Sequence, residues 1–536
     1  MNRRRFIQNS AVLAGSVALW PERMAGQGAS ANTFDIIIVG AGSSGCVIAN
    51  RLTADPNLRV LLLEAGGPPS HADAANPGRW TSLIGSEMDW QYLTQPEPAL
   101  KGRQVAWPRG KAYGGSSAIN ALSYARGHRA AYDEWATASE SSVWSYRALL
   151  PHFFRSERNS RGASEYHGAS GPWVVADTPD PHAGHLAFLE AARELGFDAD
   201  PAWDFDGARH ENGAGFYQKN IHEGRRHSVA DAFLVPALSR PNLVVRDRAV
   251  ASRVRFEGRR ATGVDFIRDG RQETAHANRE VILTAGAIET PKVLMLSGIC
   301  PAAAMKPHGI TIVLDNPDVG AHLQDHPRVS VRWQSRQTQA PSSVSAGLLT
   351  SSRSRTVAGP PDLQFYVGRG LAAPDDFVTL TVALTRPVSR GTLTLASSDP
   401  LAPPLIRAAY FDAAEDLDAM VEGVRLGQAL AAAKAYAALR GAPAPPSAAP
   451  LDTPDQIRAF IRATSETMFH PAGTCRMGTG AGSVVDAELR VRGVEGLRVA
   501  DASIMPTVIN CQCNAACVMI GERAADFILE SGDGRE

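Results

Sequence analysis

Several short runs of aliphatic and β-branched residues set the pattern of this chain. Residues 35–39 and 59–63 are two of these runs, and the segment between them contains small residues typical of a helix packed tightly on a strand. Runs without polar alternation are typical of strands that are covered on both faces. The pattern therefore predicts two neighbouring strands of a parallel sheet, joined by a helix.

Similar runs recur far along the chain and are candidate strands of the same sheet. They are residues 243–245, the alternating stretches around Val254 and Val264, residues 280–284 and residues 497–500. We expect these runs to extend the parallel sheet that begins at residue 35. A helix is expected to begin at Glu289-Thr290-Pro291, because proline is favoured in the first turn of a helix.

A second pattern, alternation of apolar and polar positions, appears later in the chain. Residues 363–366, 379–384 and 391–395 alternate in this way, which is typical of antiparallel strands. Residues 413–434 have the pattern of a helix, and residues 440–454 are rich in proline, alanine and serine, which favours a surface connection. The predicted fold class is α/β (α+β overall), with a Rossmann-like parallel-sheet domain and a second domain of antiparallel sheet and helices.

The turn after the first predicted strand has the spacing of a dinucleotide-binding motif. Gly40, Gly42 and Gly45 form G-x-G-x-x-G, and Ser43 and Ser44 lie between them. Such glycines allow a tight turn and a close approach of the backbone to a pyrophosphate. The N-terminus of the following helix would attract the same negative charge.

Glu64 ends the second predicted strand, 19 residues after Gly45. An acid at this spacing can accept hydrogen bonds from the adenosine ribose, and it disfavours a 2′-phosphate. The stretch is thus predicted to bind FAD or NAD, and it does not choose between them. The alternative is a glycine turn in a parallel sheet that binds no ligand.

Length and charge limit the class of protein. A chain of 536 residues exceeds one typical core, so two domains are expected. Its 54 Lys and Arg residues nearly balance its 55 Asp and Glu residues, which gives no reason to expect nucleic acid or an anionic membrane as a partner.

Six cysteines are too few for a disulfide scaffold. Cys511, Cys513 and Cys517 have poor zinc spacing, so packing is the favoured role, a disulfide is the alternative, and no metal site is predicted.

The N-terminal residues resemble an export signal. Arg3-Arg4-Arg5-Phe6-Ile7-Gln8 matches the twin-arginine pattern, an apolar segment follows at residues 11–20, and Ala29-Ser30-Ala31 is a candidate cleavage site. We therefore predict a signal peptide at residues 1–31 and a bacterial periplasmic location, with no stable membrane insertion after cleavage. A basic, frayed N-terminus and an uncleaved anchor are the alternatives.

A second glycine-rich loop lies at residues 107–127, with the sequence WPRGKAYGGSSAINALSYARG. Gly115 and Ser116 would let backbone and hydroxyl groups approach a flat or phosphorylated ligand closely, and Arg109 adds positive charge. Such a loop is expected to face the same cofactor as the first motif.

With VGAGSSG before it, this loop resembles the first signature of the glucose–methanol–choline (GMC) oxidoreductases, FAD enzymes that oxidise alcohols. Residues 285–298 (AGAIETPKVLMLSG) resemble the second signature, and LQDH at 323–326, MFHPAGTCRMG at 468–478 and VADASIMPTVINCQCNAACVMIGERAAD at 499–526 follow in family order. The resemblance covers nearly all of the chain after the signal. It implies a discontinuous FAD-binding domain at residues 33–159, 226–309 and 476–536, and a substrate-binding domain at residues 160–225 and 310–475.

The resemblance also implies the catalytic residues. His470 occupies the position of the family's catalytic histidine, and histidine is the usual proton acceptor near neutral pH. Asn514 occupies the second catalytic position, where its amide can donate to the substrate oxygen. The expected reaction is oxidation of a CH–OH group to a carbonyl, with hydride transfer to flavin N5. Alone, the histidine would more often be a solvated or capping residue, and the asparagine a helix cap.

The cofactor-binding residues implied by the two motifs and the resemblance form two groups. The ADP half would contact Gly40, Gly42, Ser43, Ser44, Gly45 and Glu64, with Val250 at the adenine; the flavin, ribityl and pyrophosphate part would contact Arg109, Gly115, Ser116, Asn120, Asp501 and Ala502. Some family members attach FAD covalently through a histidine that aligns with Ile119 here, so FAD is expected to be non-covalent. Asp325 and His326 are interpreted as structural residues at a domain crossing.

Several functional alternatives stay open from the sequence. A lyase or decarboxylase reaction on the same fold is one, and a non-catalytic flavin-binding redox partner is another. The identity of the small-molecule alcohol is not predicted. The electron acceptor could be oxygen, a quinone or a cytochrome, and a periplasmic address favours a respiratory acceptor.

Overall fold

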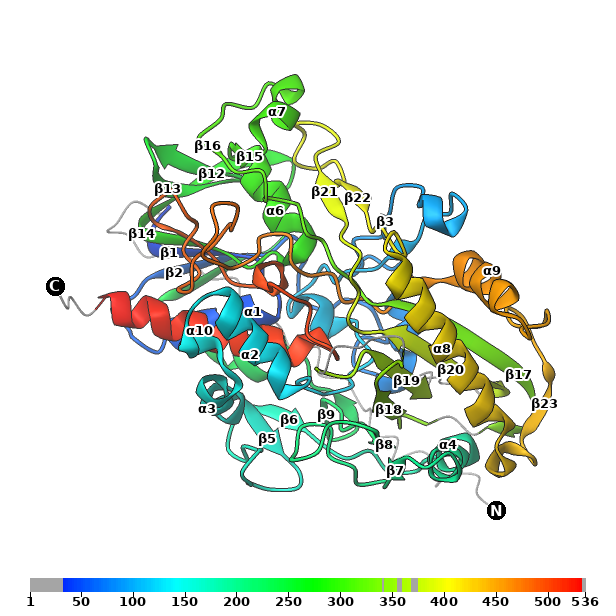
Figure 1. The fold of residues 1–536 in the computed structure, drawn as a ribbon. Helices are drawn as coiled ribbons and strands as arrows, with labels where there is room; N and C mark the ends of the chain where they lie inside the picture. Colours follow the sequence, from blue (N-terminus) through cyan, green and yellow to red (C-terminus); the bar gives the residue numbers. More distant parts are fainter. Residues whose placement is uncertain (1–31, 340–341, 354–358, 368–374, 533–536) are drawn as a thin grey trace, which may run out of the picture.

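Two large sheets organise the computed structural model, which describes residues 32–339, 342–353, 359–367 and 375–532 (Figure 1). The predicted signal at residues 1–31 lies outside the described residues. The first sheet contains, in spatial order, β11 (Leu243–Arg246), β2 (Val60–Leu63), β1 (Thr33–Val39), β14 (Arg271–Leu283), β13 (Arg260–Arg268) and β12 (Ala249–Glu257), and β25 (Leu497–Val499) also pairs with β14.

The centre of the first sheet is parallel, as the uninterrupted apolar runs predict. β1 pairs in parallel with β2 and β14, β2 with β11, and β14 with β25. Ile36 lies between Val60 and Glu280 in register, and residues 36–38 are fully buried. The glycine turn after β1 therefore lies at the carboxyl edge of this sheet, where ligands of α/β proteins bind.

The prediction that all these strands are parallel is wrong for β12 and β13. These strands pair antiparallel with each other, and β13 pairs antiparallel with β14. The turn between β13 and β14 has Asp269 and Gly270 at φ 49° and 73°, so both adopt the left-handed conformation that a type I′ hairpin requires. The Asp-Gly pair is a hairpin signal in the sequence that the apolar pattern alone does not reveal.

The second sheet is antiparallel except at one edge, which confirms the prediction from alternation. Its order is β23 (Arg440–Pro443), β17 (Pro327–Gln339), β20 (Asp375–Leu384), β19 (Leu363–Val367), β18 (Ala346–Thr350), β8 (Gly213–Phe216) and β7 (Asp198–Ala199), with β24 (Glu466–Thr467) also on β17. Only the β7–β8 pair of this sheet is parallel in the part of the chain that the structure describes. Helix α8 (Ala414–Ala432), which closely matches the helix predicted at 413–434, covers the sheet (Figure 1).

Two predicted segments of this second region differ in the structure. Residues 440–443 form the edge strand β23 instead of a surface connection, because they add to the exposed edge of β17. Residues 391–395 contribute β21 (Thr392–Thr394), which pairs with β22 (Leu405–Arg407) in a separate two-stranded ladder instead of the main sheet. Proline-rich composition and alternation indicate local conformation, but they do not identify the pairing partner.

Helix α6 (Gly286–Leu296) begins three residues before the predicted start, so Pro291 lies inside it. Proline cannot donate to the carbonyl group four residues earlier, which belongs to Ala287. The hydroxyl group of Thr474 donates to that carbonyl oxygen instead, at 2.7 Å. A distant side chain therefore lets the helix accommodate the proline, and nothing local in the sequence indicates this.

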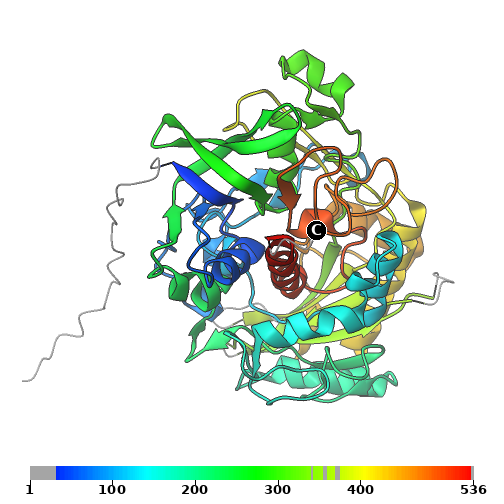
Figure 2. The ribbon, with the colours of Figure 1, turned by 90° about the vertical axis from the view of Figure 1, so that its left-hand side faces the viewer.

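Helix α10 (Cys513–Gly532) lies beside α1 (Ser43–Leu52), as Figure 2 shows from the end of α10. Gly521 permits the close approach, since a Cβ there would lie 2.8 Å from the carbonyl oxygen of Ser44. The buried carboxylate of Glu522 accepts hydrogen bonds from Arg51 Nε and Nη2 at 2.8 and 2.7 Å. This packing brings the N-terminus of α10 to the glycine turn that precedes α1.

The remaining elements surround these sheets. The other helices are α2 (Arg129–Ala138), α3 (Tyr146–Ser156), α4 (Ala183–Glu194), α5 (Val235–Ala237), α7 (Ala302–Met305) and α9 (Pro454–Thr464). Short ladders pair β3 (Tyr92–Leu93) with β4 (Ala106–Trp107), β9 (Ile221–His222) with β10 (Arg225–Arg226), β5 (Glu157–Asn159) with β6 (Trp173–Val175), and β15 (Ile299–Cys300) with β16 (Leu314–Asp315). The last two ladders cross the boundaries predicted at residues 159/160 and 309/310, so the exact domain limits stay a prediction.

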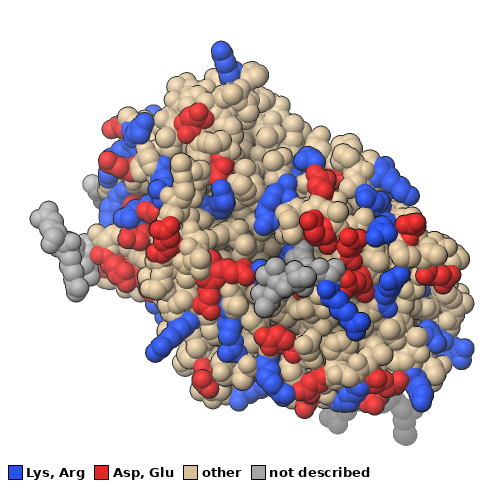
Figure 3. All heavy atoms as spheres, in the orientation of Figure 1, with Lys and Arg blue, Asp and Glu red and all other residues tan. Residues whose placement is uncertain are grey.

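The surface has mixed charge. In Figure 3, Lys and Arg side chains are interspersed with Asp and Glu side chains over the face shown, which agrees with the near-zero net charge. Within the described ranges, no helix combines the length and the apolar character needed to cross a membrane.

Candidate active site

Two cavities of the molecule share several lining residues. The first cavity follows the carboxyl edge of the parallel strands, and the second lies between that edge and the antiparallel sheet. The second cavity has a volume of about 540 Å³. The residues that line both are Ser43, Ser116, Arg109, Pro471, Ala502 and Cys517.

The glycine turn forms one wall of the first cavity, and two of its glycines have no space for a side chain. Gly40 has φ 106°, and a Cβ there would lie 2.7 Å from the carbonyl oxygen of Thr284. A Cβ at Gly45 would lie 2.0 Å from the carbonyl oxygen of Gly40, so Gly45 lets α1 pack on the turn and does not itself line the cavity. Gly115 has φ 52°, and its Cβ would lie 2.8 Å from Gly42 Cα. The two predicted glycine loops therefore meet.

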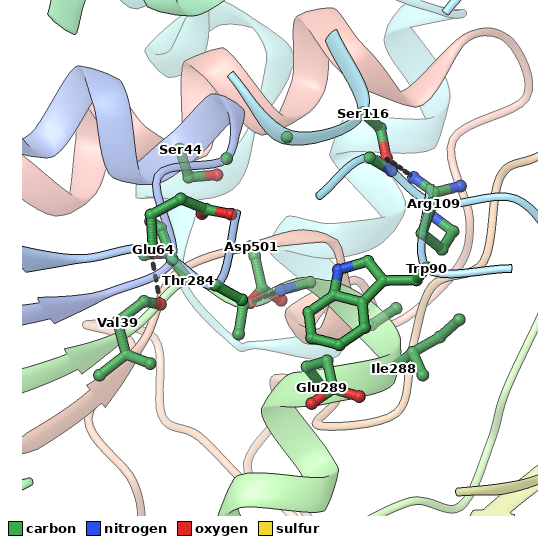
Figure 4. Close-up of a pocket in the computed structure, with 18 of the residues that line it drawn as sticks. Val39, Ser44, Glu64, Trp90, Arg109, Ser116, Thr284, Ile288, Glu289 and Asp501 are labelled. Atoms are coloured by element: carbon green, nitrogen blue, oxygen red, sulfur yellow. Dashed lines mark hydrogen bonds between the residues drawn. The ribbon is translucent and has the colours of Figure 1, made fainter. Parts of the chain in front are cut away.

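Glu64 lies at the floor of the first cavity, at the end of β2 (Figure 4). Its two carboxylate oxygens accept hydrogen bonds from the backbone N–H groups of Ala41 and Gly66, both at 2.8 Å. Burial raises the pKa of Glu64 to about 7. Each carboxylate oxygen can accept a second hydrogen bond, so Glu64 can still receive one from a ligand hydroxyl group.

Arg109 and Ser116 lie together where the two cavities meet (Figure 4). Arg109 donates from Nη2 to Ser116 Oγ and from Nη1 to the carbonyl oxygen of Phe469, both at 2.6 Å. Burial lowers the pKa of Arg109. Asn120 lines the second cavity only, and its Oδ1 accepts from Arg226 Nη1 at 2.9 Å.

Asp501 closes the far side of the first cavity (Figure 4). Its Oδ2 accepts from Gly286 N at 2.8 Å and from Thr290 Oγ1 at 2.6 Å, and its Oδ1 accepts from Ser503 N at 2.8 Å. Burial raises the pKa of Asp501. Val250, on β12, also lines this cavity.

The first cavity fits a dinucleotide. A Cβ would clash with backbone at Gly40 and Gly115 in its wall. The start of α1 offers free N–H groups, and Glu64 offers carboxylate oxygens at the end of the second strand. Gly40, Gly42, Ser43, Ser44, Glu64, Arg109, Gly115, Ser116, Val250, Asp501 and Ala502 all line it. The structure thus brings together nearly all of the predicted cofactor-binding residues.

His470 lines the second cavity and is held from two sides. Its backbone N–H donates to Asp325 Oδ1 at 2.7 Å, and its Nδ1 lies 2.9 Å from Nδ1 of His326. The second carboxylate oxygen of Asp325 accepts from the hydroxyl group of Tyr410. Since Nδ1 is engaged, Nε2 is the ring nitrogen of His470 that remains available to a substrate.

Burial lowers the pKa of His470 well below 6.5, and the positive charges of Arg109 and Arg328 lower it further. Burial also lowers the pKa of His326, to about 3. Both rings are therefore neutral at pH 7, and a neutral imidazole is the form that can accept a proton.

Asn514 lies in the first turn of α10 and also lines the second cavity. Its Oδ1 accepts a hydrogen bond from Ser43 Oγ at 2.6 Å. Because the oxygen is fixed by a donor, the amide Nδ2 is the group that can donate to a ligand. Ser43 thus links the glycine turn of the first cavity to the second predicted catalytic position.

Three features of this site are not predicted by the sequence. The sequence predicts structural roles at a domain crossing for Asp325 and His326, whereas the structure places both against His470. The hydrogen bond from Ser43 to Asn514 joins residues 471 positions apart, so no local pattern predicts it. Cys513 and Cys517 line the second cavity, and with Cys511 they are free thiols, as the packing interpretation predicts.

Comparisons with known proteins agree with this arrangement. The family models described as GMC oxidoreductase match residues 34–328 and 387–521. Choline dehydrogenase of Mus musculus is 38% identical over 538 residues, covering 92% of this chain and 89% of that protein. Alcohol dehydrogenase [acceptor] of Pseudomonas putida is 38% identical over 540 residues, covering 93% and 96%. The structure of pyridoxine 4-oxidase from Mesorbium loti matches with a TM-score of 0.85 at 32% identity, covering 92% and 98%.

Proposed function

The chain belongs to the GMC oxidoreductase family, and from this premise we propose that His470 and Asn514 are the catalytic residues with which it oxidises an alcohol to a carbonyl. The enzyme is an FAD-dependent oxidoreductase. FAD, when bound, supplies the acceptor for the hydride that leaves the carbinol carbon. The chain must supply a proton acceptor for the hydroxyl group and hold the oxygen as it gains negative charge.

His470 is the proton acceptor in this proposal. The observation that carries it is the hydrogen bond between Nδ1 of His470 and Nδ1 of His326, at 2.9 Å. When His470 carries its proton on Nδ1, it donates to His326, and Nε2 has a free lone pair toward the cavity. His326 is a positioning residue, because it fixes the tautomer and orientation of His470.

Asn514 binds the substrate oxygen in this proposal. The hydroxyl group of Ser43 holds Oδ1, so Nδ2 can donate to the oxygen while remaining neutral. The hydroxyl proton passes to His470 Nε2, and the C–O bond becomes a carbonyl as the hydride leaves. Both groups line the same cavity of about 540 Å³, which must accommodate the flavin ring as well as the substrate.

An anaerobic titration tests the proposal. Purified protein with bound FAD is mixed with a panel of primary and secondary alcohols while the visible absorption of the flavin is followed. Bleaching by one class of alcohol, with formation of the matching aldehyde or ketone, is expected. If no alcohol bleaches the flavin, the catalytic proposal fails, and lyase, decarboxylase or non-catalytic roles take its place. Admitting air afterwards separates an oxidase from a dehydrogenase that uses a quinone or cytochrome.

We further propose that FAD is bound without a covalent bond. The supporting observation is that Ile119, which lines the second cavity at the position of the family's attachment histidine, offers no nucleophile. Acid precipitation should release yellow flavin into the supernatant. Colour that stays in the protein pellet would contradict this proposal.

We also propose export of the folded protein to the periplasm through its twin-arginine sequence. The support is the pattern at residues 3–8 and the following apolar segment, which suit a protein that acquires its cofactor before export. Replacing Arg3 and Arg4 by lysine should leave the protein in the cytoplasmic fraction of its host. Unchanged fractionation of this variant would contradict the proposal.

A further inference from the structure

One wall of the second cavity carries positive charge at alternating positions of β17. Arg328, Ser330 and Arg332 line the cavity, while Val329 and Val331 between them are buried in the core. Side chains of a strand alternate between its two faces, so these three residues of β17 face the cavity together. The neighbouring strands β20 and β19 add the hydroxyl groups of Thr379, Thr381 and Tyr366 to the same wall.

Arg328 lies close to His470. Its Nε donates to the carbonyl oxygen of Thr467 at 2.9 Å, and its guanidinium group lies over the ring of Phe469, 5.2 Å from the centroid. It is also one of the charges that act on His470. A group bound to Arg328 would therefore be within the length of a small substrate from the proposed catalytic base.

Glu466 is the ion-pair partner of Arg328, at 2.9 Å. The side chain of Glu466 is 60% exposed, whereas that of Arg328 is 23% exposed. Ion pairs with a solvated partner contribute little to stability. A substrate anion could therefore replace Glu466 at the guanidinium group at little cost.

The balance of charge in the second cavity is positive. Among the described lining residues, the ionised side chains are Arg109, Arg328, Arg332 and Glu466. Arg109 is held by Ser116 and the carbonyl oxygen of Phe469, whereas the carboxylate that pairs with Arg328 is largely exposed, so Arg328 is the arginine proposed to bind a substrate anion. Positively charged substrates would be repelled here, and negatively charged ones attracted.

We propose that the substrate is an alcohol that also carries a carboxylate or another anionic group, which Arg328 binds while His470 and Asn514 hold the hydroxyl group. Guanidinium groups bind carboxylates with paired hydrogen bonds, which fixes orientation as well as position. This inference rests on the proposed function. It separates the chain from relatives named choline dehydrogenase, since choline carries a fixed positive charge and would meet the arginine wall.

Three benzyl alcohols that differ in the charge of the group opposite the hydroxymethyl group test the inference. They are 4-(hydroxymethyl)benzoate, 4-(hydroxymethyl)benzamide and 4-(hydroxymethyl)phenyl-trimethylammonium, and a second set is 4-hydroxybutyrate, 1-butanol and choline. Anaerobic stopped-flow reduction of the bound flavin gives the apparent Kd and the limiting rate for each. The anionic member is expected to bind about 10- to 100-fold more tightly than the neutral one, and the cationic member most weakly.

Variants of the ion pair give effects of opposite sign. Arg328→Gln should raise the apparent Kd of the anionic alcohol about 10- to 100-fold and leave that of the neutral alcohol nearly unchanged. Arg328→Lys should restore part of the loss. Glu466→Gln removes the competing carboxylate, so it should lower the Kd of the anionic alcohol. A purely structural ion pair would instead make both substitutions weaken binding. Arg336→Gln is the matched control, because Arg336 is exposed on the same strand and does not line the cavity.

A binding measurement separates failure of this inference from failure of the proposed function. Benzoate and 4-methylbenzoate carry the anion without an oxidisable hydroxyl group, and their binding is followed by the change in the flavin spectrum. Weakening of this binding by Arg328→Gln supports the anion site even if no alcohol is oxidised. Equal affinity for anionic, neutral and cationic alcohols, or an equal effect of Arg328→Gln on all three, would overturn the inference while leaving alcohol oxidation intact.

Discussion

The two cavities of this protein are built by different means. The first is shaped mainly by backbone, because a Cβ at Gly40, Gly45 or Gly115 would lie less than 3 Å from other backbone atoms. The second is shaped by side chains that lie at strand ends and helix starts far apart in the sequence. His326 and His470 are 144 positions apart, and Ser43 and Asn514 are 471 apart.

This difference has a physical origin. A dinucleotide presents the same pyrophosphate to every protein that binds it, and close backbone approach requires fixed glycine spacing. A substrate is recognised by whichever side chains the antiparallel sheet directs into the cavity, and the alternation of the strand leaves their chemistry free to vary. Adding a side chain at a crowded glycine is therefore expected to abolish FAD binding. Replacing a single side chain of the second cavity should instead alter the affinity or the reaction rate for the substrate.

The largest expected effect is loss of bound FAD when a side chain is placed in the glycine turn. Gly45→Val places a branched side chain where even a Cβ would lie 2.0 Å from the carbonyl oxygen of Gly40, so α1 must move away from β1. The variant should be purified without FAD, measured as the ratio of flavin to protein absorbance, and should not take up added FAD. Gly480→Ala is the control, because the nearest atom to its Cβ is 3.9 Å away. A Gly45→Val protein with a full complement of FAD would contradict the role given to the backbone.

The next effect concerns the side chains of the second cavity. His470→Ala should keep FAD but reduce the rate of flavin reduction by an alcohol roughly 100-fold or more, the usual contribution of a general base. Anaerobic stopped-flow measurements with the best substrate give this rate. His222→Ala, at a half-exposed position outside both cavities, should reduce flavin at the original rate. Reduction of the His470 variant at the original rate would remove it from the mechanism.

A smaller effect, on the rate of flavin reduction, is expected from Ser43, which lines both cavities. Ser43→Ala removes the donor to Asn514 Oδ1, so the amide group is free to rotate and its donation to the substrate oxygen weakens. The limiting rate of flavin reduction should fall about 10-fold, which corresponds to one hydrogen bond. FAD content should change little, because the backbone of the turn is intact. Loss of FAD without a change in the rate of the remaining holoenzyme would show that Ser43 serves the cofactor alone.

The smallest effect is a shift in pH dependence. His470 accepts a proton only when neutral, and its lowered pKa keeps it neutral at pH 7. With a neutral alcohol, kcat/KM should be constant around pH 7 and fall only as the pH drops through that low pKa. Arg328→Gln removes one positive charge acting on His470, so the pKa rises and the acid limb moves to higher pH, by less than about one unit. An acid limb that moves to lower pH would contradict this electrostatic interaction.

Much of the fold could be predicted because it is encoded locally. The apolar runs at residues 35–39 and 59–63 identify the parallel core, and alternation at residues 363–366 identifies antiparallel strands. The wrong predictions concern which strand or side chain each segment pairs with. β12 and β13 turn back as hairpins, residues 440–443 find the edge of β17, and Pro291 stays within α6 because Thr474 satisfies the carbonyl that it cannot reach. Pairing depends on which surfaces meet, and composition does not contain that information.

The sequence by itself determined the cofactor turn. The backbone of the turn requires glycines at a fixed spacing, and ribose binding requires an acid at the end of the second strand, so both appear as residue types at fixed intervals. Family motifs also located His470 and Asn514. Only the tertiary structure decided what surrounds them: His326 at Nδ1 of the base, Ser43 at Oδ1 of the amide, and the arginines of β17 in the substrate cavity. Those contacts arise where two sheets and the ends of α1 and α10 meet, and residues so distant in sequence have no local pattern that connects them.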